Sequence, residues 1–223
     1  MIKKEDKNSF IIPLFPLPEV VFFPGMNMPL HIFEEKYKTM ILKCLEGDKR
    51  FGIVLAQDNL CAEIGTIAEI LDVEKLEEGK MNVFAEGRKR FKIINFLKEE
   101  PYHIAEVQNY NDTGLEIDPS LKKSIRQIKR LSQKALRIFD KVSDQDLSKK
   151  LKLPEEPSEL MFLITANLSC PVELKQSILE TNSVKDRVEK VMSLLKEEIE
   201  RLEVLLENKK TKDVVVKNGK LSA

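Results

Sequence analysis

The chain has 223 residues, of which 42% are hydrophobic and 33% charged, so it can form one large domain or two small ones with a packed core. Lys+Arg and Asp+Glu both number 37, and this zero net charge argues against a protein that works by neutralising nucleic-acid phosphates. No run of residues is apolar and long enough to cross a membrane, and prolines break the apolar part of the N-terminus, which makes it a poor signal peptide.

The stretch VFFPGMNMPLHIFEEKY (21–37) concentrates aromatic residues, methionine, proline and glycine ahead of a helix. Pro24-Gly25 fits the centre of a type II turn, where glycine supplies a positive φ. We therefore expect Phe22-Phe23 to end a strand and Met26–Leu30 to form an extended loop. These apolar side chains are either core or a surface for apolar partners, a use for which flexible methionine is well suited.

A helix is predicted from Glu34 to Glu46, with acidic residues at its start and Gly47 as its stop. The residues that recur on one face at helical spacing are Tyr37, Met40, Ile41, Cys44 and Leu45.

Short strands joined by turns are predicted for most of the region up to Tyr110. Apolar residues there alternate or fill both faces, which is typical of antiparallel strands in a small barrel or sandwich. The predicted strands are 51–56, 65–75, 81–87, 88–98 and 102–110.

A basic run interrupts this region. Alternation places Arg88, Arg90 and Lys92 on one face of a strand, with Lys89 and Phe91 on the other. Basic residues beside phenylalanines could bind RNA. A solvated face of a hairpin explains the run equally well, and the neutral net charge favours that interpretation.

The period becomes helical after the segment 111–120. Asp118 can cap a helix that has Pro119 in its first turn, and an apolar stripe follows at Leu121, Ile125, Ile128, Leu131, Ala135 and Ile138. Residues 143–158 are polar and broken by prolines, which predicts a loop or a short helical turn, whereas 159–168 predicts a buried helix.

The rest of the chain predicts two further helices. A short one follows Pro171, with Ser169 as a possible cap. A capping box of Ser183 and Asp186 opens a long helix over 183–208. Residues 209–223 have no helical period and predict a flexible tail.

Signatures of catalysis, cofactors and metals are missing from the sequence. It has no GxxxxGK[ST] phosphate loop, no HExxH and no GxSxG, and neither His31 nor His103 lies near a cysteine pair. We therefore predict no catalytic, cofactor-binding or metal site. Cys44, Cys61 and Cys170 form no CxxC pair, which predicts reduced thiols and a cytoplasmic location.

The order of these pieces resembles the N-terminal substrate-binding domain of the Lon protease. The similar stretches are IIPLFPLPEVVFFPGMNMPLHIFEEKY, EIGTIAEIL, EGKMNVFAEGRKRFKI and LITANLSCPVELKQSILETNSVKDRVEKVMSLLKEEIERLE. Together they span about residues 10 to 207. The first block is the most specific, and the Gly87-to-Arg90 spacing adds independent support.

The resemblance implies an α+β fold. A PUA-like β pseudo-barrel would occupy 10–112, a helical bundle with a long terminal helix would occupy 118–208, and 209–223 would form the tail. Pro24, Gly25 and Pro29 would be structural residues.

The resemblance also implies a function. In the full-length protease an ATPase module and a peptidase module follow the long helix, and this sequence ends soon after it. We therefore expect a stand-alone, non-enzymatic domain that binds unfolded or exposed apolar segments of other proteins, by hydrophobic contact and backbone pairing at a barrel edge. The expected protein-binding residues are Phe22, Met26, Met28 and Phe33.

Two alternatives remain. One is an adaptor or regulator that docks on a protease or another specific partner through the long helix 183–208. The other is an RNA-binding PUA-like module that uses Arg88, Arg90 and Lys92, because a fold does not fix a function.

Overall fold

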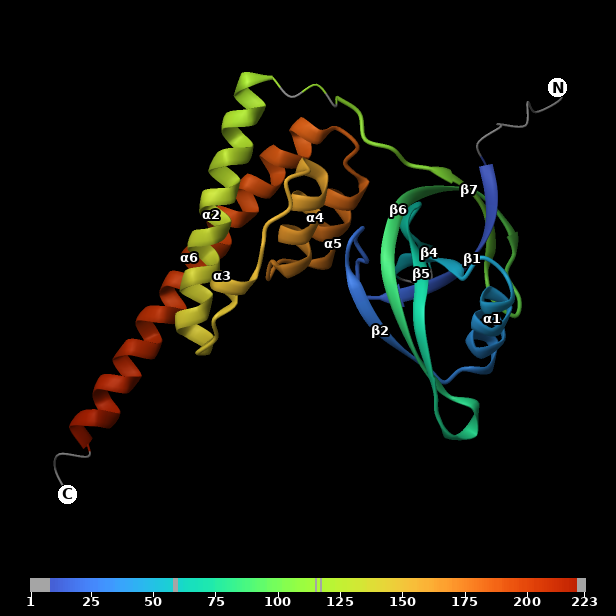
Figure 1. The fold of residues 1–223 in the computed structure, drawn as a ribbon, viewed down its shortest axis with the longest axis horizontal. Coiled ribbons are helices and arrows are strands. Elements are labelled where there is room, and N and C mark those ends of the chain that lie inside the picture. Colours follow the sequence, from blue (N-terminus) through green and yellow to red (C-terminus); the bar gives the residue numbers. More distant parts are fainter. Residues whose placement is uncertain (1–8, 58–59, 115, 117, 220–223) are drawn as a thin grey trace. The chain divides into compact units, whose positions relative to one another are not determined.

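Two units make up the structure, a computed structural model that describes residues 9–57, 60–114, 116 and 118–219 (Figure 1). The sheet unit consists of the chain up to Thr113 together with Pro171–Asn182. The helical unit consists of Gly114–Cys170 and the chain from Ser183 onward.

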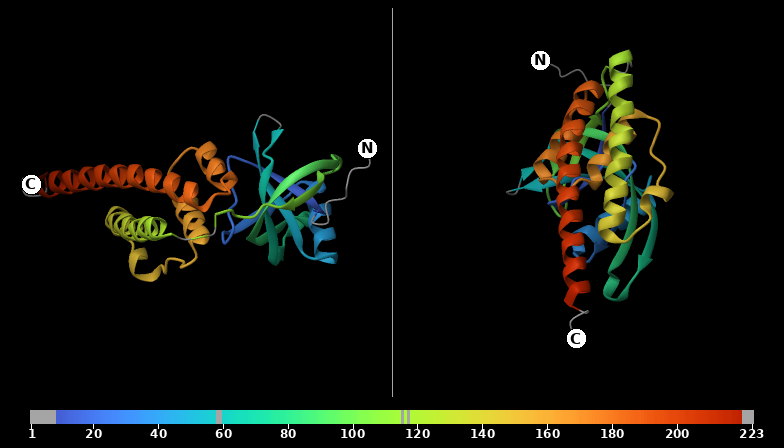
Figure 2. Two further views of the ribbon diagram at one scale, coloured as in Figure 1. Left: turned by 90° about the horizontal axis from the view of Figure 1, so that it is seen from above. Right: turned by 90° about the vertical axis from the view of Figure 1, so that its left-hand side faces the viewer.

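The sheet unit is a closed barrel of five strands with two short additions (Figures 1 and 2). The ring runs β1-β7-β6-β5-β3 and closes by pairing β3 with β1; β4 extends from β3, and β2 pairs with β6. The strands are β1 (Ser9–Pro18), β2 (Asn27–Ile32), β3 (Arg50–Gln57), β4 (Leu60–Cys61), β5 (Ile64–Lys75), β6 (Met81–Lys98) and β7 (Ile104–Asn109).

The alternating segments of the sequence do form strands, with two departures from expectation. The β1–β3 pair is parallel, and this is the pair that closes the ring. The two strands predicted over 81–98 are one 18-residue strand, β6, which curves past β5, β2 and β7. Register shifts along β6 allow this curvature, because a β-bulge bends a strand and increases its twist.

The opening stretch contains the predicted type II turn. Gly25 has φ +77°, and the amide of Met26 donates to the carbonyl of Phe23 at 3.1 Å. The turn is fixed to Gly87 of β6, since Gly25 N–H donates to Gly87 O and Gly87 N–H donates to Met26 O, both at 2.8 Å. A side chain on Gly87 would collide with the Phe23 carbonyl oxygen, 2.2 Å from the added Cβ.

The expectation for the flanks of this turn is wrong. Phe22-Phe23 lies between strands and ends none, and residues 27–32 form strand β2, not a loop. Proline is compatible with a strand when its nitrogen points away from the neighbouring strand. Pro29 meets this condition because β2 has a neighbour on one side only, β6.

Helix α1 (Glu35–Glu46) forms as predicted and ends at Gly47. Met40, Ile41 and Cys44 on its apolar face belong to the main core cluster of the barrel. The buried Lys38 ammonium also fixes the helix, because it donates to the Glu78 carbonyl at 2.9 Å as well as pairing with Glu35.

The helical unit is built on two long helices, α2 (Pro119–Ser143) and α6 (Val184–Gly219), which lie side by side (Figure 2). As predicted, Asp118 caps α2 by accepting from the amide of Leu121, and the Ser183 hydroxyl accepts from the amide of Asp186. The short α3 (Leu147–Lys150) and the apolar α4 (Pro157–Asn167) complete the unit. None of the described helices combines the length and the hydropathy needed to span a lipid bilayer.

The fold is therefore α+β, with a PUA-like pseudo-barrel followed by a helical bundle and a long terminal helix, as the resemblance implied. Helix α5 (Val172–Glu180) lies within the range predicted for the bundle, 118–208, yet it belongs to the sheet unit. The Gln176 amide donates to the carbonyl of Ile64 in β5 at 3.0 Å, which attaches α5 to the barrel.

The segment predicted as a tail from residue 209 continues α6 as far as Gly219, and residues 220–223 lie outside the described part of the chain. Adding a residue to an existing helix costs little, so a segment without an apolar stripe can extend one. Lys209 holds the helix at this point, because its ammonium donates to the Lys141 and Val142 carbonyls and pairs with Asp144. The flexibility of 209–223 stays a prediction.

Candidate functional site

The four residues predicted to bind protein occupy different environments in the sheet unit. Phe22 is 2% exposed and is a core residue, with no surface to offer a partner. Met26 and Met28 are partly buried and pack against the main core cluster. Phe33 is 58% exposed and is the only one of the four that projects into solvent.

Alternation along β2 explains this division. Leu30 and Ile32 are buried beside the partly buried Met28, so these residues share the inner face. Pro29 and His31 are exposed and therefore share the outer face, and Phe33 follows in the same phase. The His31 and Phe33 rings stack with their centroids 6.0 Å apart.

Strand β6 extends this outer surface. Phe84 pairs directly with Pro29 and is 41% exposed. Asn82 pairs with His31, and its Oδ1 accepts from the His31 ring Nδ1, 2.9 Å away. We call Pro29, His31, Phe33 and Phe84 the β2 face. It is an apolar surface of two aromatic rings and a proline, with one imidazole held in place between them.

The free edge of β2 is largely closed to backbone pairing. Among the described strands β2 pairs with β6 alone, so its other edge carries unpaired backbone groups. Pro29 lies in the middle of that edge and has no N–H to donate. Contact through the side chains of the β2 face is therefore better supported than the predicted backbone pairing.

The basic run does not form a free cationic surface. Arg88 pairs with Glu69 and Glu86, each at 2.8 Å, and Lys92 pairs with Glu63 at 3.3 Å. Arg90 is 5% exposed and is paired with Asp112. The prediction that Arg88, Arg90 and Lys92 share a solvated face is wrong, because β6 has an extra residue between Gly87 and Arg90 relative to β5, and this bulge breaks the alternation.

The polar groups form no recognisable catalytic arrangement in the described part of the chain. Burial, with a smaller effect of Asp48, raises the pKa of the Cys44 thiol to about 12, and burial also raises the pKa of Cys61. Both groups are therefore protonated thiols at neutral pH and poor nucleophiles. No set of three or more His, Cys, Asp or Glu residues among those described could hold a metal ion.

Sequence reasoning missed Pro29, His31 and Phe84 as members of this surface. The signal that could have identified them is the period of two in NMPLHIF, which separates residues 28, 30 and 32 from 29, 31 and 33. Pro29 obscures that signal, because proline ends most regular structure. Phe84 could not have been assigned without the pairing of β2 with β6.

Relatives with known names match nearly the whole chain. It is 28% identical over 212 residues to the Lon protease of Halothermothrix orenii, and 28% identical over 201 residues to that of Dictyoglomus thermophilum. The alignments cover 92% and 87% of this chain but 27% and 25% of those proteins, so the chain spans about a quarter of the length of these relatives.

Solved structures show the same fold. The Lon N-terminal domain protein from Xanthomonas campestris superimposes with a TM-score of 0.63 at 20% identity, covering 82% of this chain and 98% of that one. The N-terminal domain of the Mycobacterium avium complex Lon protease gives a TM-score of 0.66 at 19% identity, covering 84% and 98%.

A family model matches residues 11–197, which include the barrel, the β2 face, α2 to α5 and the first part of α6. The match is to a substrate-binding domain and not to an ATPase or protease domain. Sequence, fold and matched length agree, and the chain belongs to the family of the ATP-dependent protease La (LON) substrate-binding domain.

Proposed function

We propose that this chain is a non-catalytic protein-binding domain that captures unfolded or exposed apolar segments of other proteins on the β2 face. The observation that carries the proposal is the pair of exposed phenylalanines, Phe33 at 58% and Phe84 at 41%, on adjoining parts of one surface. Membership of a substrate-binding family supports protein substrates as the class of ligand. Cys44, Cys61 and Cys170 form no disulfide within the described part of the chain, and this supports a cytoplasmic location.

Weak and broad affinity follows from the size of the β2 face. Each apolar side chain that becomes buried contributes about 1.5–3 kcal/mol before ordering costs are subtracted. Two phenylalanines and a proline therefore give modest affinity for many sequences. This is the behaviour expected of a domain that recognises apolar segments in general.

The test compares binding of a fluorescently labelled, permanently unfolded protein to the unmodified chain and to a variant carrying Phe33→Ser and Phe84→Thr. We expect the dissociation constant to rise at least about tenfold, since about 1.4 kcal/mol of lost contact corresponds to a factor of ten. Threonine at position 84 keeps a residue suited to a strand.

The matched control is Leu60→Ser, which removes an even more exposed apolar side chain, 73% exposed, from β4. It should leave the dissociation constant unchanged. An equal rise in the dissociation constant for the control and for the double variant would contradict the assignment of the binding site to the β2 face. The activity assay is the second control: we expect neither peptide cleavage nor ATP hydrolysis by the chain.

An adaptor or regulator that docks through the long helix remains a second candidate. It is supported by two apolar side chains on α6 that are open to solvent, Val204 at 57% exposed and Leu205 at 38%. This function predicts one specific protein partner and no affinity for generic unfolded chains. Titration with the labelled unfolded protein distinguishes this function from capture of apolar segments.

A further inference from the structure

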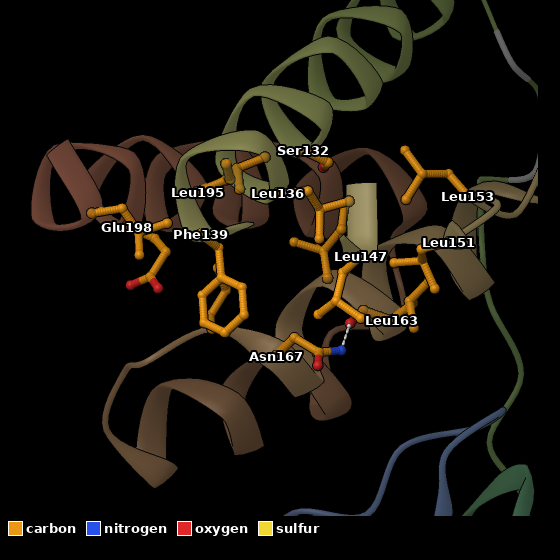
Figure 3. A pocket seen from close by; sticks show the side chains of 14 residues that line it. Ser132, Leu136, Phe139, Leu147, Leu151, Leu153, Leu163, Asn167, Leu195 and Glu198 are labelled. Carbon is orange, nitrogen blue, oxygen red and sulfur yellow. Dashed lines mark hydrogen bonds between the residues drawn. The ribbon is translucent and has the colours of Figure 1, made fainter. Parts of the chain in front are cut away.

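The helical unit contains an open apolar cavity of about 410 Å³ (Figure 3). Its lining comes from α2, α3, α4, α6 and the segment that joins α3 to α4. Most of the lining residues are leucines. Leu136 of α2, Leu163 of α4 and Leu195 of α6 are three of them (Figure 3).

The rim of this leucine cavity is open to solvent. Phe139 is 37% exposed, Leu147 40% and Leu151 43%, although all three are large apolar side chains. Three such residues around one hollow form a surface that a partner's apolar side chains can enter. The volume suits about three aliphatic side chains at the packing density of protein interiors.

One polar group in the cavity lacks a hydrogen-bond partner among the described residues. The Ser132 hydroxyl is buried, with the residue 5% exposed, and it makes no hydrogen bond to any residue that the structure describes. A buried hydroxyl without a partner is costly and is rare in proteins. An occupant that brought a hydrogen-bonding group to Ser132 would remove that cost.

A basic hollow of about 580 Å³ adjoins the leucine cavity and shares Leu136, Leu151 and Leu153 with it. Its charged lining residues are Lys129, Arg137, Lys152 and Glu155, three cations against one carboxylate. Lys129 pairs with Glu155 at 2.7 Å. Arg137 and Lys152 are exposed and take part in no ion pair within the described ranges, so two positive charges stand beside the apolar rim.

The carboxylate of Glu198, which also lines the leucine cavity, is already neutralised by an ion pair. Glu198 accepts two hydrogen bonds from Arg201, at 2.6 and 2.8 Å. The Asn167 amide donates to the Leu163 carbonyl at 2.8 Å. Of the described charged residues that line the two hollows, Arg137 and Lys152 are therefore the ones without an ion pair, and both are positive.

We propose that the leucine cavity is a docking site for a short protein segment in which two or three aliphatic residues are followed by acidic residues. The aliphatic side chains fill the cavity, a polar group of the segment reaches the Ser132 hydroxyl, and the carboxylates lie over Arg137 and Lys152. A fatty acyl chain would match the leucines and the cations, but it would leave Ser132 without a partner. The site is independent of the β2 face and does not rest on the proposed function.

The experiment is a fluorescence titration of the full chain with two labelled twelve-residue peptides. One carries three leucines followed by three glutamates, and the other carries three lysines in place of the glutamates. We expect saturable binding of the acidic peptide with a dissociation constant of about 10–100 µM. The basic peptide should bind at least about tenfold more weakly.

Three variants locate the site. Arg137→Glu with Lys152→Glu should remove the preference for the acidic peptide, whereas Lys123→Glu with Arg130→Glu, an equal charge change at exposed positions of α2 outside both cavities, should preserve it. Ser132→Ala should weaken acidic-peptide binding about fivefold without lowering the melting temperature, because it deletes a buried hydroxyl that has no partner.

Equal affinity for the two peptides would overturn the proposal, as would unchanged affinity in either cavity variant. Tight binding of a long-chain fatty acid that excludes the acidic peptide would also overturn it, in favour of a lipid site. Loss of unfolded-protein binding in the Phe33→Ser, Phe84→Thr variant tests the proposed function alone. That variant should bind the acidic peptide normally.

Discussion

The Arg90 guanidinium lies inside the sheet unit, where it donates to the carbonyl oxygens of Leu179 at 2.6 Å and Thr181 at 3.0 Å and pairs with Asp112. It also lies over the ring of Tyr110, 4.8 Å from the centroid. Those carbonyls are at the end of α5, where a helix leaves acceptors without internal partners. Arg90 therefore attaches α5 to the barrel and is not available to a nucleic acid.

We predict that Arg90→Leu lowers the free energy of unfolding by about 3 kcal/mol, because it leaves the Asp112 carboxylate and two carbonyl groups without their donor. Urea denaturation followed by circular dichroism measures this change. Lys89→Ala, at the exposed neighbouring position, should change stability by less than about 0.5 kcal/mol. Equal stability of the two variants would show that the Arg90 contacts are not structural.

Gly87 is a second single residue on which the local structure depends. Its amide and carbonyl both bond the turn at Pro24-Gly25, and the Phe23 carbonyl lies where a Cβ would be. We predict that Gly87→Ala markedly lowers the melting temperature, since backbone must move to admit the methyl group. Gly47→Ala is the matched control, because its Cβ would meet only ordinary contacts at 3.7 Å; an equally small effect of both substitutions would contradict this account.

At the scale of elements, β2 carries the candidate site on one face and core on the other. We predict that Met28→Ser lowers the free energy of unfolding by about 2 kcal/mol, because this side chain packs against the main core cluster. Phe33→Ser should change it by less than about 0.5 kcal/mol, since Phe33 is 58% exposed. Urea denaturation checks both predictions. A larger loss of stability for Phe33→Ser than for Met28→Ser would show that Phe33 is in the core and Met28 is not.

Elements were predictable from sequence where a local signal was strong. The stripe of α1, the Asp118 cap of α2 and the glycine of the opening turn all depend on neighbours within a few residues. Strand β2 was missed because proline breaks most regular structure but is allowed on an edge strand. Whether a strand lies at an edge depends on pairing between distant residues, which a single sequence does not contain.

The same limit applied to the candidate site. Phe33 can be proposed from residue type, but Phe84 joins it only through the pairing of β2 with the distant strand β6. Phe22 and Phe33 are equally good candidates by residue type. They differ in burial, since Phe22 is packed in the core and Phe33 is exposed. Burial of a large apolar residue is settled by tertiary contacts, and residue type alone did not predict it.

At the scale of the whole molecule, the chain leaves the sheet unit after Thr113 and re-enters it at Pro171 to form α5. Hydrogen bonds attach it to the barrel, from Gln57 to Glu173, Gln176 to Ile64, Arg90 to Leu179 and Tyr110 to Glu180. The buried side chains of Ile178 and Leu179 accompany them. A barrel without this helix has exposed apolar surface and a buried arginine that has lost the carbonyl oxygens of Leu179 and Thr181.

We predict that a fragment ending at residue 113 is less stable than the same fragment joined to 171–182 by a flexible linker. Thermal unfolding followed by circular dichroism compares the two. The linked fragment carrying Arg90→Leu should lose most of the increase in melting temperature that residues 171–182 provide. Equal melting temperatures for the two fragments would show that α5 contributes nothing to the barrel.

The measurement that tests the central claim most directly is fluorescence anisotropy of a labelled, permanently unfolded protein titrated with this chain at low and at high salt. Apolar capture on the β2 face predicts saturable binding whose dissociation constant hardly changes with salt, since the contacts carry no net charge. Absence of binding would contradict the claim and favour a dedicated partner. Binding that disappears at high salt would contradict it as well, because it would show that charge, and not apolar surface, holds the ligand.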